Sequence, residues 1–153
     1  MKFVLAVTVA TAALFSASAS AQDYSLNPNY GTVSLQAGFT PDPQTFQIVT
    51  GGNINAAATL GGACLGMITN APDFRLNYVA GSFDLFISAV TNGDATLVIN
   101  APDGSWHCDD DYAGNLNPGI QFYGPASGQY DIWVGDLNGS NNAGVLQISE
   151  LSF

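Results

Sequence analysis

Positive charge is almost absent from this sequence. The 153 residues include two lysines and arginines, one histidine and two cysteines, against twelve aspartates and glutamates. Nucleic acids and anionic membranes both need a basic face on the proteins that bind them, so the sequence argues against these two classes of partner. Charged residues of either sign make up only 9% of the chain. Solubility must therefore come from asparagine, glutamine, serine, threonine and glycine.

A long apolar run is also missing. The opening segment, "MKFVLAVTVATAALFSASASAQ", is apolar over residues 3–15, which is shorter than the roughly 20 residues of a membrane span. Small residues follow, and Ala19-Ser20-Ala21 fits the pattern of a signal cleavage site. We therefore expect residues 1–21 to be a signal peptide, in preference to an uncleaved anchor. The expected localisation is exported, either secreted or periplasmic, with no membrane insertion.

The exported chain, residues 22–153, has the size of one ordinary domain. Lys2 leaves with the signal peptide, so Arg75 remains as the only strong base against twelve acids, a net charge of −11 with the histidine neutral. That charge favours cations as ligands. Residues 22–30 are interpreted as a loose N-terminal lead.

The two cysteines are Cys64 and Cys108. An even number of cysteines in an exported chain predicts a disulfide between them. Two free thiols, serving as a nucleophile or as metal ligands, are the alternative, and the oxidising compartment disfavours them. If the disulfide forms, Cys108 cannot act as a nucleophile.

A helical period with capping residues is absent beyond the signal segment. Short runs of β-branched and aromatic residues alternate instead with turn signals such as Asn92-Gly93 and Pro102-Asp103-Gly104. In the second turn, proline presets φ, and Gly104 can adopt the left-handed conformation that closes a three-residue hairpin. This pattern predicts an all-β, single-domain antiparallel β-sandwich, jelly-roll-like. The expected strands are residues 32–39, 46–50, 63–68, 74–79, 83–90, 95–100, 119–124, 129–135 and 143–151.

Alternation along the strands predicts which side chains face the core. Trp106 and Cys108 share a face, so a tryptophan packed on a buried disulfide is expected. Trp133 lies on the opposite face of its strand from the core residues and is expected to point outward unless another segment covers it. Two interpretations stay open: Trp133 stacks on sugar rings beside Tyr123 or Tyr112, or the N-terminal lead covers it.

The second half of the chain resembles the bacterial pre-peptidase C-terminal domain. The resemblance covers about residues 72–150 and rests on the order and spacing of short motifs. These motifs are Asp94-Ala95-Thr96-Leu97, Asp109-Asp110, Gly114, and Ser127-Gly128-Gln129-Tyr130-Asp131-Ile132-Trp133-Val134-Gly135.

The resemblance implies an exported β-sandwich of jelly-roll type. Members of this family often accompany secreted peptidases, some bind calcium, and some are thought to assist the binding of a substrate or a surface. This chain departs from the usual setting because it contains no peptidase domain. The resemblance therefore does not imply that the chain is itself a peptidase.

Motifs with a catalytic mechanism are lacking as well. His107 is the only histidine, it neighbours the expected disulfide, and no Gly-x-Ser-x-Gly motif occurs. A pair of carboxylates can in principle hydrolyse a glycoside, but these acids cluster in polar turns, where a raised pKa is not expected. We therefore predict that the protein is not an enzyme.

Three consecutive aspartates follow Cys108, although adjacent carboxylates repel one another. A calcium ion, which takes six to eight oxygen ligands in flexible geometry, would offset that repulsion. Gly114 would permit a sharp turn in the loop, and the spacing is not that of an EF-hand. A solvated acidic loop without an ion is the alternative, and it stays open. The expected calcium ligands are Asp109, Asp110, Asp111, Asn115 and Asn117, with Asp94 and Asp103 from neighbouring turns.

Two hypotheses for the function follow. The first is an exported non-catalytic module, stabilised by calcium, that recognises a polysaccharide, a protein or a cell-surface partner. The second is a small secreted hydrolase or a peptidase-associated accessory domain. Stabilisation by calcium without turnover would favour the first, and turnover that depends on one aspartate would favour the second.

The calcium prediction is tested by thermal unfolding of residues 22–153. Calcium from chelator up to about 10 mM should raise the melting temperature, because an ion at a hundredfold its dissociation constant adds about 2.7 kcal/mol. Magnesium demands stricter octahedral geometry and should not reproduce the rise. The double variant Asp109→Asn/Asp111→Asn should abolish it. An equal response to both ions, or to neither, would mean that the loop is only solvated.

Overall fold

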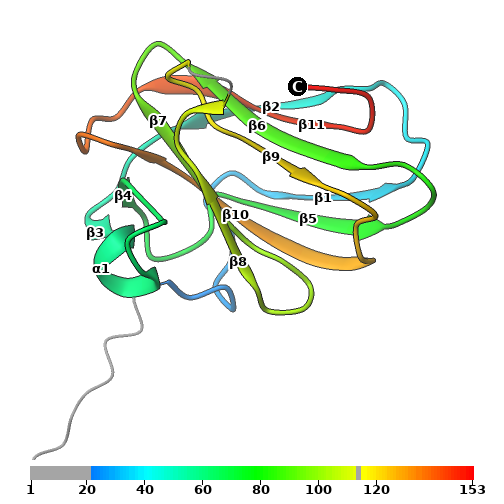
Figure 1. Ribbon diagram of the computed structural model, residues 1–153, viewed down its shortest axis with the longest axis horizontal. Helices are drawn as coiled ribbons and strands as arrows, with labels where there is room; N and C mark the ends of the chain where they lie inside the picture. The colour runs from blue at the N-terminus through cyan, green and yellow to red at the C-terminus, as the bar shows by residue number, and fades with distance from the viewer. Residues whose placement is uncertain (1–21, 113–114) are drawn as a thin grey trace, which may run out of the picture.

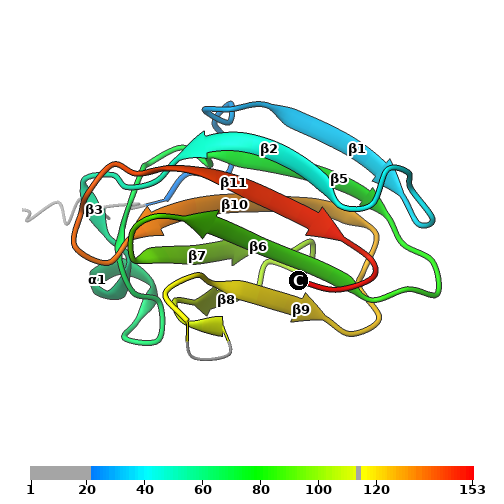
Figure 2. The same cartoon turned by 90° about the horizontal axis from the view of Figure 1, so that it is seen from above.

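Two β-sheets pack face to face, as Figures 1 and 2 show from two directions. The computed structural model describes residues 22–112 and 115–153. The all-β sandwich with one disulfide is thereby confirmed. Within the described residues, no helix is long and apolar enough to cross a membrane.

Sheet A has seven strands. Its longest strand, β10, pairs along one edge with β7 and along the other with β5 and β4. β8 and β1 lie outside β7 and β5, and β1 with β5 is the only parallel pair in the described part of the sheet. The strands of sheet A are β1 (Thr32–Gln36), β3 (Ile54–Asn55), β4 (Met67–Ile68), β5 (Phe74–Val79), β7 (Ala95–Asn100), β8 (Trp106–Asp109) and β10 (Gly128–Asp136).

Sheet B has four antiparallel strands in the order β2, β11, β6, β9. They are β2 (Gln44–Val49), β6 (Leu85–Thr91), β9 (Gly119–Phe122) and β11 (Ala143–Ser149). The two sheets enclose the main hydrophobic core. Alternate residues fill it, and each buried aliphatic side chain contributes about 1.5–3 kcal/mol. Among them are Leu76, Leu85, Ile87, Leu97, Ile99, Ile132, Val134, Leu146 and Ile148.

The Pro102-Asp103-Gly104 turn forms as predicted and connects β7 to β8. The Gly104 amide donates to the Ala101 carbonyl at 2.9 Å, and the Ala101 amide donates to the Ser105 carbonyl at 2.9 Å. Gly104 has φ +82°, the left-handed conformation that the sequence required of it.

A second, smaller core lies on the outer face of sheet A, the face turned away from sheet B. It is covered by residues 54–68, here called the cap segment, which contain β3, β4 and a short helix, α1 (Ala56–Leu60). Buried Ala56, Cys64 and Ile68 pack against Val98 and Trp133. Both faces of β7 are therefore covered, and all six of its residues are buried.

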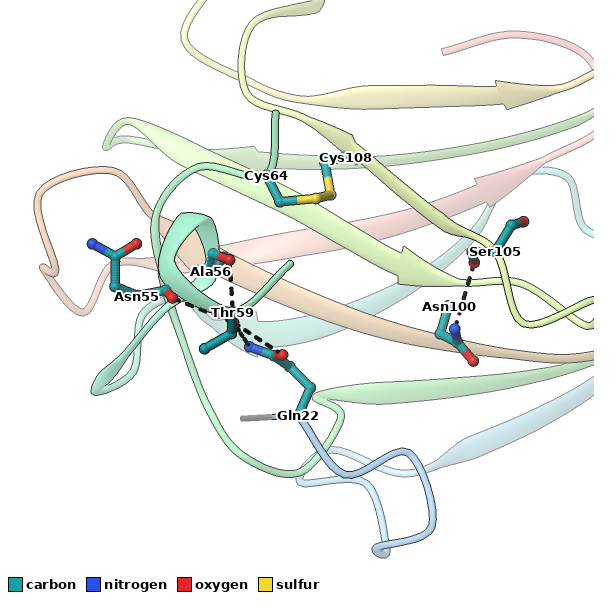
Figure 3. Close-up of a disulfide and its surroundings, with 8 residues drawn as sticks. All are labelled: Gln22, Asn55, Ala56, Thr59, Cys64, Asn100, Ser105 and Cys108. Carbon is teal, nitrogen blue, oxygen red and sulfur yellow. Dashed lines mark hydrogen bonds between the residues drawn. A yellow bond between two sulfur atoms is a disulfide. The ribbon is translucent and has the colours of Figure 1, made fainter. Parts of the chain in front are cut away.

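The predicted disulfide Cys64–Cys108 is confirmed, and it joins the cap segment to β8 (Figure 3). Trp106 packs on Trp133, with ring centroids 5.4 Å apart, and Trp106 and Cys108 are partly buried against the second core. The expected contact between a tryptophan and the disulfide region is thus present, although Trp106 keeps an accessible part.

α1 was not expected from the sequence. Its N-cap is Asn55, whose side-chain oxygen accepts a hydrogen bond from the Ala58 amide at 3.2 Å. A helix of five residues is too short to show a hydrophobic period, so only the asparagine before an alanine run could have indicated it. The expected strand 63–68 is correspondingly reduced to β4.

The expectation that Trp133 points outward into solvent is wrong. Trp133 does face away from the main core, as the alternation indicated, but it is 0% exposed. The cap segment covers it, and the second core includes no residue of the N-terminal lead, residues 22–30, that was considered as its cover. Trp133 is therefore not available as a binding contact.

The N-terminal lead is tied to the sandwich rather than loose. The Gln22 side chain donates to the Thr59 hydroxyl of α1 at 3.0 Å (Figure 3). The Asp23 amide donates to the Asn70 carbonyl, and Tyr30 to Asp73. These bonds hold residues 22–30 against one side of sheet A.

Replacing Trp133 tests this second core. Trp133→Ala should lower the free energy of unfolding by about 3–5 kcal/mol, because a buried aromatic side chain leaves a cavity. Trp133→Phe should cost less, because it also removes an indole N–H that has no acceptor among the described residues. Urea denaturation measures both. Tyr123→Ala is the control, because Tyr123 is 79% exposed and its loss should change little. Similar losses for Trp133→Ala and Tyr123→Ala would place Trp133 outside any core.

Candidate functional site

The outer face of sheet A is covered at one end and open at the other. Three residues of β10 point to this face at successive alternate positions. Trp133 is buried beneath the cap segment, Asp131 is paired with Arg75, and Gln129 is exposed. The open part of the face therefore begins two residues beyond the ion pair.

A row of uncharged polar side chains crosses the open part of this face. Ser34 of β1 is in register with Asn77 of β5, and Asn77 with Gln129 of β10. All three are exposed. Gln129 Nε2 donates to Asp131 Oδ2 at 2.7 Å, whereas the side chains of Ser34 and Asn77 have no hydrogen-bond partner in the described part of the chain. The side chains of Ser34 and Asn77 and the side-chain oxygen of Gln129 can therefore meet a ligand.

The next row holds the only strong base of residues 22–153 in a fixed position. Arg75 Nε lies 2.6 Å from Asp131 Oδ1, and both side chains are largely buried. A second guanidinium nitrogen donates to the carbonyls of Tyr24 and Leu26, at 2.5 and 3.1 Å. Arg75 therefore anchors the N-terminal lead and presents no free positive charge on this face.

Two adjoining hollows form a groove across the face. The first, a cavity of about 620 Å³, lies over Ser34, Gln36, Asn77 and Val79. The second, about 610 Å³, lies between Tyr24 of the lead and Trp106 of β8, and both hollows share residues 127–129. We call the two together the outer groove. The first hollow carries amide side chains beside the apolar Val79, and the second carries two aromatic side chains.

Gly128 is needed where the two hollows meet. Its φ is +146°, and a Cβ on it would lie 2.7 Å from Pro102 Cβ. A side chain here would push the 101–105 turn away from β10 and change the place where the two hollows meet.

The turn between β7 and β8 brings together the three residue types of a serine triad, but in an unproductive order. Ser105 Oγ donates to Asp103 Oδ1 at 2.5 Å, and His107 Nε2 lies 2.9 Å from the same Oγ. A serine has one hydroxyl proton, and the bond to Asp103 uses it, so His107 must donate to Ser105. A nucleophilic serine needs the reverse, a histidine that accepts its proton.

The acidic residues predicted to bind calcium are brought together only in part. Asp94 lies close enough to the loop that burial and the charges of Asp111, Asp136 and Asp110 raise its pKa. Burial chiefly raises the pKa of Asp109 too, with Asp110 and Asp111 acting in the same direction. These carboxylates are therefore close enough to repel one another.

Several expected ligand atoms are already engaged. Asp109 Oδ2 accepts from the Gly119 amide at 2.9 Å, and Asn117 Oδ1 from the Thr91 amide at 2.8 Å. Asn115 Oδ1 accepts from the Asn117 amide at 2.7 Å.

Asp94 precedes the six-residue strand β7 and Asp103 follows it, so the length of the strand separates the two side chains by roughly 20 Å. They cannot bind the same ion. No group of three histidine, cysteine or acidic side chains gathers as a metal site within residues 22–112 and 115–153. Gly114 lies outside the described residues, and calcium binding stays a prediction.

The predicted aromatic contacts separate into different places. Tyr112 packs on Phe153 with ring centroids 4.1 Å apart, and Tyr123 projects from the loop after β9. Tyr24, Asn77 and Gln129 were not predicted from the sequence as site residues. The alternation of β5 and β10 could have placed the last two on the outer face, but nothing local indicated that this part of the face stays open.

Comparison with known proteins identifies no family for this chain. No protein-family model matches it, and no curated protein does either. Among solved structures, it is similar to Aeromonas hydrophila PliG, a periplasmic lysozyme inhibitor of g-type lysozyme. The TM-score is 0.41 and the identity 15%, over 78% of this chain and 96% of the other. The resemblance to the pre-peptidase C-terminal domain stays a prediction.

One buried carboxylate links the lead to the sheet and makes stability depend on pH. Asp73 accepts hydrogen bonds from Asn29 Nδ2 and Thr69 Oγ1, and from the Val134 amide at 2.8 Å. Burial outweighs these bonds and raises the pKa of Asp73 from 3.8 to about 6. Between those values the folded state binds more protons than the unfolded state, so stability falls as pH rises through this window.

The expected size of this effect is about 2 kcal/mol lost between pH 4 and pH 7. Urea denaturation across that range should show the loss, and Asp73→Asn, which cannot titrate, should flatten it. Asp23→Asn is the control, because the pKa of exposed Asp23 is lowered and its effect falls below the window. A slope that is unchanged in Asp73→Asn would assign the pH dependence to other carboxylates.

Proposed function

We propose that this protein is an exported, non-catalytic binding module that holds an uncharged polysaccharide in the outer groove. The observation that carries the proposal is a row of exposed polar side chains, Ser34, Asn77 and Gln129, that leads toward Tyr24 and Trp106; only Gln129 Nε2 is engaged in the described part of the chain. Export is supported by the sequence of residues 1–21 and by the disulfide, which is typical of oxidising compartments.

The chemistry of the groove suits sugars. Hydroxyl groups of a glycan can both donate to and accept from amide side chains, and the two aromatic side chains can cover the apolar faces of sugar rings. The spacing between neighbouring strands, about 4.8 Å, is close to the length of one hexose in an extended chain. A polysaccharide that crosses β1, β5 and β10 would therefore meet one polar side chain per strand.

Charge decides between neutral and anionic polysaccharides. Arg75 is neutralised by Asp131, and the exported chain carries a net charge of −11. An anionic polymer would be repelled by this field and would find no free cation in the groove. An uncharged polysaccharide meets neither obstacle.

We propose that the protein is not catalytic because of the hydrogen bonds around Ser105 and His107. His107 is the only histidine of the chain, and the hydroxyl of Ser105 donates its hydrogen bond to Asp103. A serine held in this way is not activated, and the groove itself contains no pair of free carboxylates.

The test is a screen of immobilised uncharged and anionic polysaccharides, followed by calorimetry with the best ligand. Ser34→Ala/Asn77→Ala should weaken binding about tenfold, since two neutral hydrogen bonds are lost. It should leave stability unchanged, because neither side chain has a hydrogen-bond partner within residues 22–112 and 115–153. Gln47→Ala, an exposed position on β2 of sheet B, is the matched control. Failure of every polysaccharide to bind, or equal affinity of the double variant and the wild type, would refute the proposal.

A further inference from the structure

A separate hollow lies on the other side of the 101–105 turn from Trp106. It is a cavity of about 410 Å³ where the edge strands β8 and β9 come side by side at the margin of the two sheets (Figure 2). We call it the edge cleft. Its walls include His107 of β8, Phe122 of β9, Tyr123 and Pro125 of the following loop, and Tyr130 of β10.

Aromatic rings form much of the edge cleft. Phe122 stands edge-on to His107 at 4.9 Å and to Tyr130 at 5.2 Å, so the three rings form a continuous wall. Tyr130 is buried, and its hydroxyl donates to the Ala126 carbonyl at 2.8 Å. Tyr123 differs: it is 79% exposed, and its side chain makes no hydrogen bond or ring contact in the described part of the chain. The exposed ring of Tyr123 therefore does not contribute to packing of the core.

The charge around the cleft is negative. Asp103 lines it, and only its Oδ1 is engaged, by the amide and hydroxyl of Ser105. Asp84 lies behind the Tyr123 loop, where it accepts from Gln121 Nε2 and the Gly124 amide. Arg75 is the only lysine or arginine in the described residues, and it is committed to Asp131. The one imidazole, His107, is held by Ser105.

We propose that the edge cleft receives an arginine side chain of a protein partner. A guanidinium is planar, so it can stack on the exposed face of Tyr123 while it donates to the free oxygen of Asp103. The aliphatic stem of arginine suits the apolar wall at Phe122. The partner is therefore a protein with a basic surface, and the net charge of −11 accelerates its approach. This site lies on the other side of the 101–105 turn from the outer groove, and the two share Asp103.

The experiment is an NMR titration of residues 22–153 with the peptide acetyl-Gly-Arg-Gly-amide, which follows the backbone amides of His107 and Gly124. The same peptide with citrulline in place of arginine has nearly the same shape without the charge. We expect the arginine peptide to shift these amides, the citrulline peptide to bind several-fold more weakly, and added salt to weaken the arginine peptide.

Matched variants locate the contact. Tyr123→Ala should weaken the arginine peptide about threefold to fivefold, and Asp103→Asn about threefold. Asp23→Asn is the control, because Asp23 accepts from the Ser25 amide and hydroxyl at 2.9 and 2.5 Å, the same arrangement as Asp103 with Ser105. It removes the same charge from the same kind of turn and should leave binding unchanged.

Four results would overturn the proposal. Equal binding of the citrulline peptide would show that the charge of arginine does not contribute to binding. Equal effects of Asp23→Asn and Asp103→Asn would show that binding responds to the net charge of the chain and not to Asp103 itself. Shifts confined to other regions would place the peptide elsewhere. Displacement of the peptide by a tetramer of glucosamine, bound more tightly at the same amides, would assign the cleft to an amino sugar instead.

Discussion

The partial cover of sheet A is the constraint on which the rest of the structure depends. Trp133 points away from the main core and would be exposed on a bare sheet, so the cap segment must cover it. The disulfide Cys64–Cys108 joins the cap segment to β8. The position of the cap segment therefore does not depend only on the few apolar contacts that the five residues of α1 can make. The cap covers one end of the face and stops, and the polar remainder of the same face is the outer groove.

Arg75 shows how a single charge can organise such a surface. It pairs with Asp131 and holds the carbonyls of Tyr24 and Leu26, so it brings the N-terminal lead to the rim of the groove. The same contacts remove it as a positive charge toward solvent. Among the described residues Arg75 is the only lysine or arginine, so the formal charges left to meet a partner are carboxylates, and the ligands should be neutral or cationic.

The hairpin between β7 and β8 divides the two proposed sites. Successive residues of β8 point to opposite faces, so Trp106 lies in the outer groove while His107 lies in the edge cleft. Asp103 lines both hollows from the turn itself. A polysaccharide in one and a basic protein at the other would make the module a bridge between them, without either ligand needing the other.

The sequence by itself determined the features that depend on short-range chemistry. Runs of β-branched and aromatic residues predicted most of the strands, although β3 and β8 were not among them, and Pro102-Asp103-Gly104 predicted the turn after β7. The count and compartment of the cysteines predicted the disulfide. Only the tertiary structure decided which part of the outer face is covered. The cap that buries Trp133 lies some seventy residues earlier in the chain, and Arg75 meets Asp131 across 56 residues. A strand pattern of period two shows that a side chain faces away from the core. Whether that side chain then meets solvent, a covering segment or a ligand depends on contacts between distant residues, which no local pattern encodes.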